Sequence, residues 1–185
     1  MKQKPPIRSR LTSLGIGILL WWLGQPLSYG QAVSEYQVKA AYLYNFAKFV
    51  EWPPETFTST TAPIRMCILN DRSFESQLNQ VVKDKNVAGR PVAVIPVQNG
   101  EQSRDCQVLF LGSLQNLQAL RVIEILHGTS VLTVEESNGF VKDGGMINFV
   151  LQGNQVHFQV NHKAATQAGL RLSSRLLSVA KLVIE

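Results

Sequence analysis

The sequence has little of several features that would identify a function class directly. Among 185 residues it contains two cysteines and three histidines, and aromatic residues make up 8%. Its mean hydropathy of +0.01 excludes a polytopic membrane protein. With 45% hydrophobic and 17% charged residues, the chain is neither a disordered tail nor a coiled coil. It can therefore bury one compact core.

The first 32 residues have the organisation of a secretory signal peptide. Residues 1–10 carry four basic side chains and no acidic one, residues 11–23 (LTSLGIGILLWWL) are apolar and uncharged, and the small residues Gly30 and Ala32 provide a cleavage pattern. A thirteen-residue helix spans about 20 Å, which is less than a bilayer core of about 30 Å. We therefore expect cleavage after Ala32 and export of a single mature domain, residues 33–185.

Removal of this segment changes the interpretation of the charge. The whole chain has a net charge of +5, and the loss of four basic residues lowers it to +1. The mature part also has no cluster of Lys and Arg interleaved with aromatic residues. We expect no nucleic-acid partner, because such binding depends on neutralising phosphates.

The two cysteines are Cys67 and Cys106. In an oxidising compartment an even number of cysteines favours pairing, and two separate buried thiols are the alternative. We predict a disulfide bond between them, which would stabilise the fold by about 4 kcal/mol in the chain-entropy model.

Helical and strand-like patterns alternate through most of the mature chain, which predicts a mostly parallel sheet with helices on both faces. Residues 152–154 (QGN) separate two later strand-like runs and indicate an antiparallel hairpin. Apolar residues at helical spacing then predict a long C-terminal helix over residues 163–183. The expected fold class is an α/β three-layer sandwich. Its expected helices cover residues 34–50, 74–83, 114–126 and 163–183, and its strands cover 64–69, 91–97, 107–111, 130–134, 146–151 and 155–160.

The sequence offers no catalytic set, metal site or cofactor motif. The nearest approach to a nucleophile elbow, around Ser113, lacks the flanking glycines. No H-E-x-x-H or Cys/His cluster is present, and the adjacent Glu135 and Glu136 point to opposite faces of an extended segment. We predict a protein that is not an enzyme, with an envelope hydrolase as a minor alternative.

Ligands of doubly wound sheets bind at the carboxyl ends of the parallel strands. This rule predicts a ligand-binding rim, and ordinary loop and capping roles are the alternative interpretation of its residues. The predicted rim consists of Asn70, Asp71, Gly112, Ser113, Glu135 and Glu136.

Aromatic residues concentrate in the first expected helix and at its end. Tyr42, Phe46 and Phe49 fit one helical face and are expected to pack on the sheet, whereas Tyr44 points elsewhere. Tyr44 and Trp52 are therefore candidate residues for a protein interface.

Four segments of the chain closely resemble the YfiR/HmsC-like family of bacterial periplasmic proteins. They are KAAYLYNFAKFVEWP (39–53), GGMINFV (144–150), QVHFQVN (155–161) and AGLRLSSRLLSVAKLV (168–183). The resemblance implies a periplasmic α/β domain that represses an inner-membrane diguanylate cyclase by binding its periplasmic part, and so lowers cyclic di-GMP signalling and biofilm formation.

The resemblance also implies that Cys67 and Cys106 occupy the positions of a family disulfide. A second cysteine pair of some relatives has no counterpart in residues 135–145. The resemblance is compatible with a homodimer, because relatives are often dimeric. A periplasmic small-molecule receptor that reports to a kinase or transporter is the alternative function.

Overall fold

A computed structural model describes residues 34–112, 114 and 116–185; the expected signal peptide and its cleavage site lie outside these residues. An eight-stranded sheet has the strand order β10-β8-β7-β6-β5-β2-β4-β3. Neighbours from β4 to β7 are parallel, as are β8 and β10, whereas the β7–β8 and β3–β4 pairs are antiparallel. The strands of this sheet are β2 (Ile64–Leu69), β3 (Asn86–Val87), β4 (Arg90–Val97), β5 (Val108–Phe110), β6 (Leu132–Glu135), β7 (Ile147–Gln152), β8 (Gln155–Asn161) and β10 (Leu182–Ile184).

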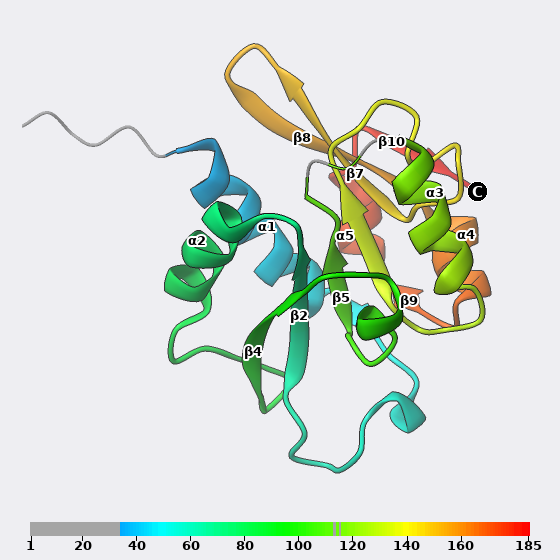
Figure 1. Ribbon diagram of the computed structural model, residues 1–185. Coiled ribbons are helices and arrows are strands. Elements are labelled where there is room, and N and C mark those ends of the chain that lie inside the picture. Colours follow the sequence, from blue (N-terminus) through cyan, green and yellow to red (C-terminus); the bar gives the residue numbers. More distant parts are fainter. Residues whose placement is uncertain (1–33, 113, 115) are drawn as a thin grey trace, which may run out of the picture. The chain divides into compact units, whose positions relative to one another are not determined.

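Helices cover both faces of this sheet, so the α/β three-layer prediction is confirmed (Figure 1). Helices α1 (Glu35–Lys48), α2 (Arg72–Val82) and α5 (Ser174–Ser178) contribute to the core on one face, which we call the α1 face. Helix α3 (Asn116–Ile125) packs on the opposite α3 face. Alternate strand residues supply the two cores, because successive side chains of a strand point to opposite sides.

The core of the α1 face is rich in aromatic side chains. Phe46 of α1 lies 5.0 Å from Phe158 and 5.7 Å from Phe149, measured between ring centroids. Tyr42, one turn earlier, contacts the same two rings. The expected packing of this helical face on the sheet is therefore confirmed, and it places α1 across the hairpin strands β7 and β8.

The α3 face contains the disulfide bond. Cys67 of β2 and Cys106, just before β5, are joined, with their Cα atoms 6.0 Å apart. Both residues are buried in the core formed with Leu109, Ala119 and Val122. The predicted disulfide is confirmed, and it links β2 to the segment just before the adjacent strand β5.

Local sequence determines where the first helices begin. The hydroxyl of Ser34 accepts from the Gln37 backbone N–H at 3.2 Å, while the Gln37 side chain accepts from the Ser34 N–H at 3.0 Å. This capping box satisfies two N–H groups at the start of α1. Asp71 caps α2 by accepting from the Phe74 N–H at 2.9 Å.

The expected long helix over residues 163–183 is wrong. This segment forms α4 (His162–Gln167), β9 (Arg171–Leu172), α5 and β10. Gly169 has a φ of +76°, which interrupts the helix after α4. The next residues pair with other strands: β9 is antiparallel to β1 (Val50–Glu51), and β10 lies parallel to β8. Pairing with distant strands thus overrides the helical spacing of the apolar residues.

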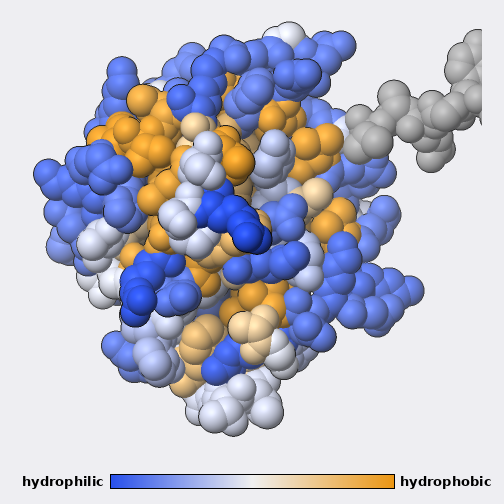
Figure 2. All heavy atoms as spheres, turned by 180° about the vertical axis from the view of Figure 1, so that it is seen from behind, coloured by the Kyte–Doolittle hydropathy of each residue, from blue (hydrophilic) through white to orange (hydrophobic). Residues whose placement is uncertain are grey.

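Two short 3₁₀ helices complete the described elements, at Pro54–Thr56 and Glu101–Ser103. Over residues 34–112, 114 and 116–185, no helix has both the length and the apolar character needed to cross a membrane. Seen from behind, apolar side chains form patches at the surface that are bordered and interrupted by hydrophilic ones (Figure 2).

Candidate functional site

The carboxyl ends of β2, β5 and β6 lie side by side at one edge of the sheet. Helix α2 follows β2 and packs on the α1 face, whereas α3 follows β5 and packs on the α3 face. The chain therefore leaves these two neighbouring strands in opposite directions. Such a topological switch point is the usual ligand crevice of open α/β sheets.

The structure brings part of the predicted rim together at this point. Asn70 has a φ of +60° and turns the chain after β2, and Asp71 follows as the cap of α2. Gly112 lies against them: a Cβ at this position would be 2.5 Å from the Leu69 carbonyl oxygen and 3.2 Å from the Asp71 Cβ. Ser113 lies outside the described residues. The crevice between β2 and β5 is therefore closely packed.

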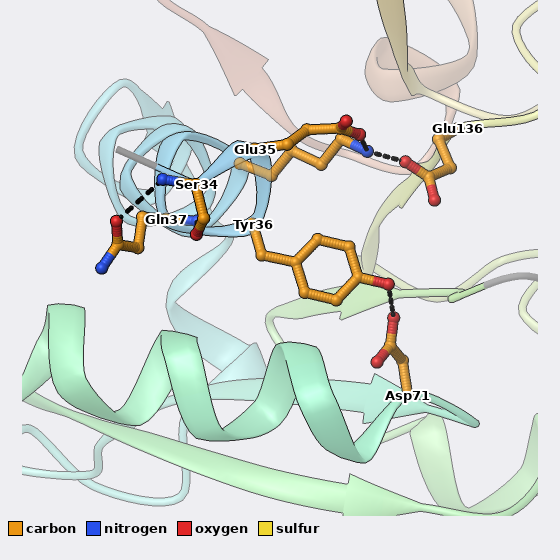
Figure 3. A network of polar contacts seen from close by, with 7 residues as sticks. Ser34, Glu35, Tyr36, Gln37, Asp71 and Glu136 are labelled. Atoms are coloured by element: carbon orange, nitrogen blue, oxygen red, sulfur yellow. Dashed lines mark hydrogen bonds and ion pairs between the residues drawn. The ribbon is translucent and has the colours of Figure 1, made fainter. Parts of the chain in front are cut away.

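Glu136 reaches from the end of β6 to α1. Its carboxylate pairs with the ammonium group of Lys39, which also pairs with Glu35 one helical turn earlier (Figure 3). Lys39 is only 1% exposed. Burial lowers the pKa of Lys39, but the hydrogen bonds and negative charges of Glu136 and Glu35 outweigh burial and raise it above its ordinary value. Lys39 is therefore a buried cation shared by two carboxylates.

A second contact joins α1 to the end of β2. The Tyr36 hydroxyl donates to Asp71 Oδ2 at 3.1 Å (Figure 3), and the Tyr36 ring packs edge-on against Phe74. Burial, followed by the charge and hydrogen bond of Asp71, raises the pKa of Tyr36. Tyr36 and Lys39 thus bind the first two turns of α1 to the predicted rim.

Glu135 has a different environment from its neighbour Glu136. It is 1% exposed, and its Oε2 accepts from the Ser137 hydroxyl at 2.8 Å. Burial raises its pKa, the Ser137 hydrogen bond lowers it, and the charge of Glu136 raises it, with a result of about 7. Among the described residues, Glu135 is therefore an acidic group that can change charge near neutral pH.

Tyr44 and Trp52, the predicted interface residues, are both half-buried. The Tyr44 hydroxyl donates to the Asn86 carbonyl at 3.1 Å, and the ammonium groups of Lys48 and Lys85 lie 5.5 Å and 4.8 Å from its ring. The Trp52 Nε1 donates to the Gln107 carbonyl at 3.1 Å. Each side chain thus has an anchoring contact within the chain as well as an accessible part.

Trp52 lines a cleft of about 520 Å³ that also contains Phe57, Lys48 and Arg90, together with Glu51, whose carboxylate pairs with Arg171. The Arg90 guanidinium lies 3.8 Å from the Phe57 ring centroid and donates to the carbonyls of Ser59 and Ala62. We call this site the aromatic–basic cleft. Its chemistry suits an acidic segment that carries an apolar or aromatic side chain.

The residues that the sequence did not indicate as functional are Tyr36, Lys39, Phe57 and Arg90. One signal was present: Glu35 and Lys39 are four residues apart, with the acid first, which is the favourable order for a helical ion pair. The partner Glu136 is 97 residues away from Lys39. No sequence spacing indicates that contact.

Comparison with solved structures supports the fold. The ABC domain in complex with L-Trp from Streptococcus pneumonia matches with a TM-score of 0.51 and 12% identity over 78% of this chain. A conserved domain protein from Vibrio cholerae O1 biovar El Tor matches with a TM-score of 0.55 and 9% identity over 81% of this chain. The chain spans 60% of the length of each of these structures. At these identities the similarity concerns the fold alone.

Comparison with family models addresses the chain itself. The YfiR/HmsC-like model matches residues 36–181, from the first turn of α1 to the residue before β10. This match includes Tyr36, Lys39, Glu136 and the aromatic–basic cleft. The chain therefore belongs to the YfiR/HmsC-like family.

Proposed function

We propose that this protein is a periplasmic regulator that binds the periplasmic part of an inner-membrane diguanylate cyclase and represses it. The observation that carries the proposal is the family match over residues 36–181. Repression of the cyclase lowers cyclic di-GMP and with it biofilm formation. The protein acts by binding and catalyses no reaction.

Repression by binding requires a difference in affinity. A partner that exchanges between an active and an inactive conformation is shifted toward the one that this protein contacts better. A preference of about 1–3 kcal/mol changes the populations by about 5–150-fold. A rigid, disulfide-linked domain suits this role, because little of the binding energy is lost in ordering it.

We propose the aromatic–basic cleft as the partner's binding surface. It offers half-buried aromatic side chains in Trp52 and Phe57 beside the exposed cation Lys48. Tyr44 contacts the same Lys48 and extends the surface toward β3. An acidic segment of the partner with an aromatic side chain would match this arrangement in charge and shape.

A gene deletion tests the regulatory function, and a charge reversal tests the cleft as the binding surface. Deletion of the gene is expected to raise cyclic di-GMP and biofilm formation, and wild-type protein is expected to restore both to their original levels. Lys48→Glu should fail to restore them, because it repels an acidic partner. The matched control is Lys181→Glu, which changes an exposed lysine beside β10, at the opposite edge of the sheet.

Two results would count against the proposal. Unchanged cyclic di-GMP after deletion argues against the regulatory function itself. Full restoration by Lys48→Glu argues only against the cleft as the binding surface. Thermal unfolding of each variant shows whether the fold is retained.

A periplasmic small-molecule receptor is the second candidate. It is favoured by the position of Asp71 and Gly112 at the topological switch point and by the likeness of the fold to a domain solved with L-Trp. In this chain Tyr36 and Lys39 fill the same rim, so a ligand must displace α1 side chains. A saturable rise in melting temperature with L-Trp or another amino acid would support this candidate, and no rise with any of them would count against it.

A further inference from the structure

Two buried oxygen atoms on neighbouring strands have no hydrogen-bond partner. They are Oε1 of Glu135 and Oδ1 of Asn148. The two residues are only 1% and 3% exposed. A buried acceptor without a partner has lost its hydrogen bonds to water and gained none in return, so each such atom in a folded protein needs an explanation.

The register of the sheet places these residues side by side. Glu135 at the end of β6 pairs with Asn148 near the start of β7, and the preceding pair is Val134 with Ile147. Val134 and Ile147 belong to the core of the α1 face, so Glu135 and Asn148 both point to the α3 face. With the Asn148 amide oriented as in the structure, an ionised Glu135 would thus place a carboxylate next to the amide oxygen, and neither unpartnered atom would have a donor.

One proton on the Glu135 carboxyl group would supply the missing hydrogen bond. A neutral carboxyl group has one O–H donor, and a hydrogen bond from it to Asn148 Oδ1 satisfies both unpartnered oxygens. The surroundings favour the neutral form, because burial raises the pKa of Glu135 to about 7 against the opposing hydrogen bond from Ser137.

The charged group that acts on Glu135 lies in the segment directly after β6. Glu136, the next residue, adds a negative charge that favours the neutral form of Glu135. The cation beyond it is Lys39, which Glu136 shares with Glu35. Asp71, the acceptor for Tyr36, is the further acidic group of the same network (Figure 3).

The position of the pair gives the proton a structural consequence. The pairing of β6 with β7 consists of the two residue pairs Val134–Ile147 and Glu135–Asn148. This short junction joins the parallel strands to the β7–β8 hairpin, which projects beyond the rest of the sheet in Figure 1. Loss of the proton would remove a side-chain hydrogen bond beside one of these two pairs.

We propose that Glu135 and Asn148 form a proton-dependent joint between the parallel strands and the β7–β8 hairpin. With the proton present, the Glu135 carboxyl group donates to Asn148 Oδ1 and the junction is closed. With the proton lost, the buried carboxylate is stabilised by reaching water, and the junction opens more often. The proposal concerns the fold itself and does not depend on the regulatory function.

The first test measures the proton directly. In a ¹³C NMR titration of the full domain, the Glu135 carboxyl carbon should titrate with a midpoint near 7. Asn148→Asp places a second carboxylate beside it, and the shared proton should raise the midpoint by about one pH unit or more. A wild-type midpoint below about 5 would overturn the proposal, because it would mean that the Asn148 amide donates to an ionised Glu135.

The second test measures the opening. Protection factors of backbone amides in residues 146–150 should fall about tenfold between about pH 6 and about pH 8, because the open state titrates near 4.5 and the closed state near 7. Glu135→Gln keeps the shape of the side chain and supplies a permanent N–H donor. Protection factors in this variant should therefore not change between the two pH values. Glu124→Gln, an exposed position on α3, is the matched control and should behave like wild type. An equal fall in Glu135→Gln would contradict the proposal.

Discussion

Lys39 and Glu136 form an ion pair that connects the second turn of α1 to the end of β6, although 97 positions separate them in the sequence. Lys39 is almost fully buried, and its ammonium group is satisfied by this contact and by Glu35. The pair holds α1 across the edge of the sheet where a ligand crevice would otherwise be expected.

Separate removal of the two partners should reveal how strongly they interact. We expect Lys39→Met and Glu136→Gln each to lower the free energy of unfolding by about 1–3 kcal/mol, and the double variant to cost less than their sum. The carboxylates of Glu35 and Glu136 both retain access to water, which keeps the cost below that of breaking a fully buried pair. Urea denaturation of the four proteins measures the coupling.

The exposed pair of Arg104 and Glu101 provides the control for this cycle. Its removal by Glu101→Gln should change stability by less than about 1 kcal/mol. Additive effects of Lys39→Met and Glu136→Gln would mean that the ion pair makes no net contribution.

Glu135 should make stability depend on pH in a defined direction. Its pKa is about 7 in the folded protein and 4.5 as an ordinary value, so between these values the folded state binds more protons than the unfolded state. Stability should therefore fall as the pH rises through this interval, by about 1.36 kcal/mol for each pH unit that separates the two pKa values. The free energy of unfolding of Glu135→Gln, relative to that of wild type, should rise by up to about 3 kcal/mol between about pH 5 and about pH 8.

Denaturant unfolding at about pH 5 and about pH 8 measures this difference. If the stabilities of wild type and Glu135→Gln change with pH in the same way, Glu135 titrates at its ordinary value in the folded state.

Two glycines with similar φ angles should differ in their tolerance of replacement by alanine. Gly112 has a φ of +50° and Gly153, in the β7–β8 turn, a φ of +56°. A Cβ added at Gly153 would have no other atom within 4 Å, whereas a Cβ at Gly112 would overlap the Leu69 carbonyl oxygen. We expect Gly153→Ala to cost about 1 kcal/mol and Gly112→Ala at least about 3 kcal/mol in unfolding experiments. Equal costs would show that the β2–β5 crevice can widen.

The disulfide should be structural. Cys67 and Cys106 are 0% and 2% exposed, so a mild reductant should leave the bond intact in the native protein and break it in urea. Replacement of both cysteines by alanine should lower the free energy of unfolding by about 4 kcal/mol, given the 39-residue separation. Mass spectrometry after treatment with the reductant measures how much of the bond is broken. Rapid reduction in the native protein would contradict a structural role for the disulfide.

The candidate site was only partly predictable. Asn70, Asp71 and Gly112 meet as expected, because the carboxyl ends of parallel strands share one edge of a sheet. The opposite directions of Glu135 and Glu136 also followed from strand geometry. The contacts of Tyr36 and Lys39 with this edge could not be predicted, because they depend on where α1 packs.

The sequence by itself determined the alternation of helices and strands, the hairpin and the caps at Ser34 and Asp71, since these depend on residues a few positions apart. Only the tertiary structure decided the fate of residues 163–183, the burial of Lys39 and the pairing of Glu135 with Asn148. Each of these requires a partner from a distant part of the chain. In the C-terminal segment, hydrogen bonds to β1 and β8 outweigh a helical pattern that is correct locally, because an amphipathic spacing specifies a buried face but not the strand that will be available to pair with it.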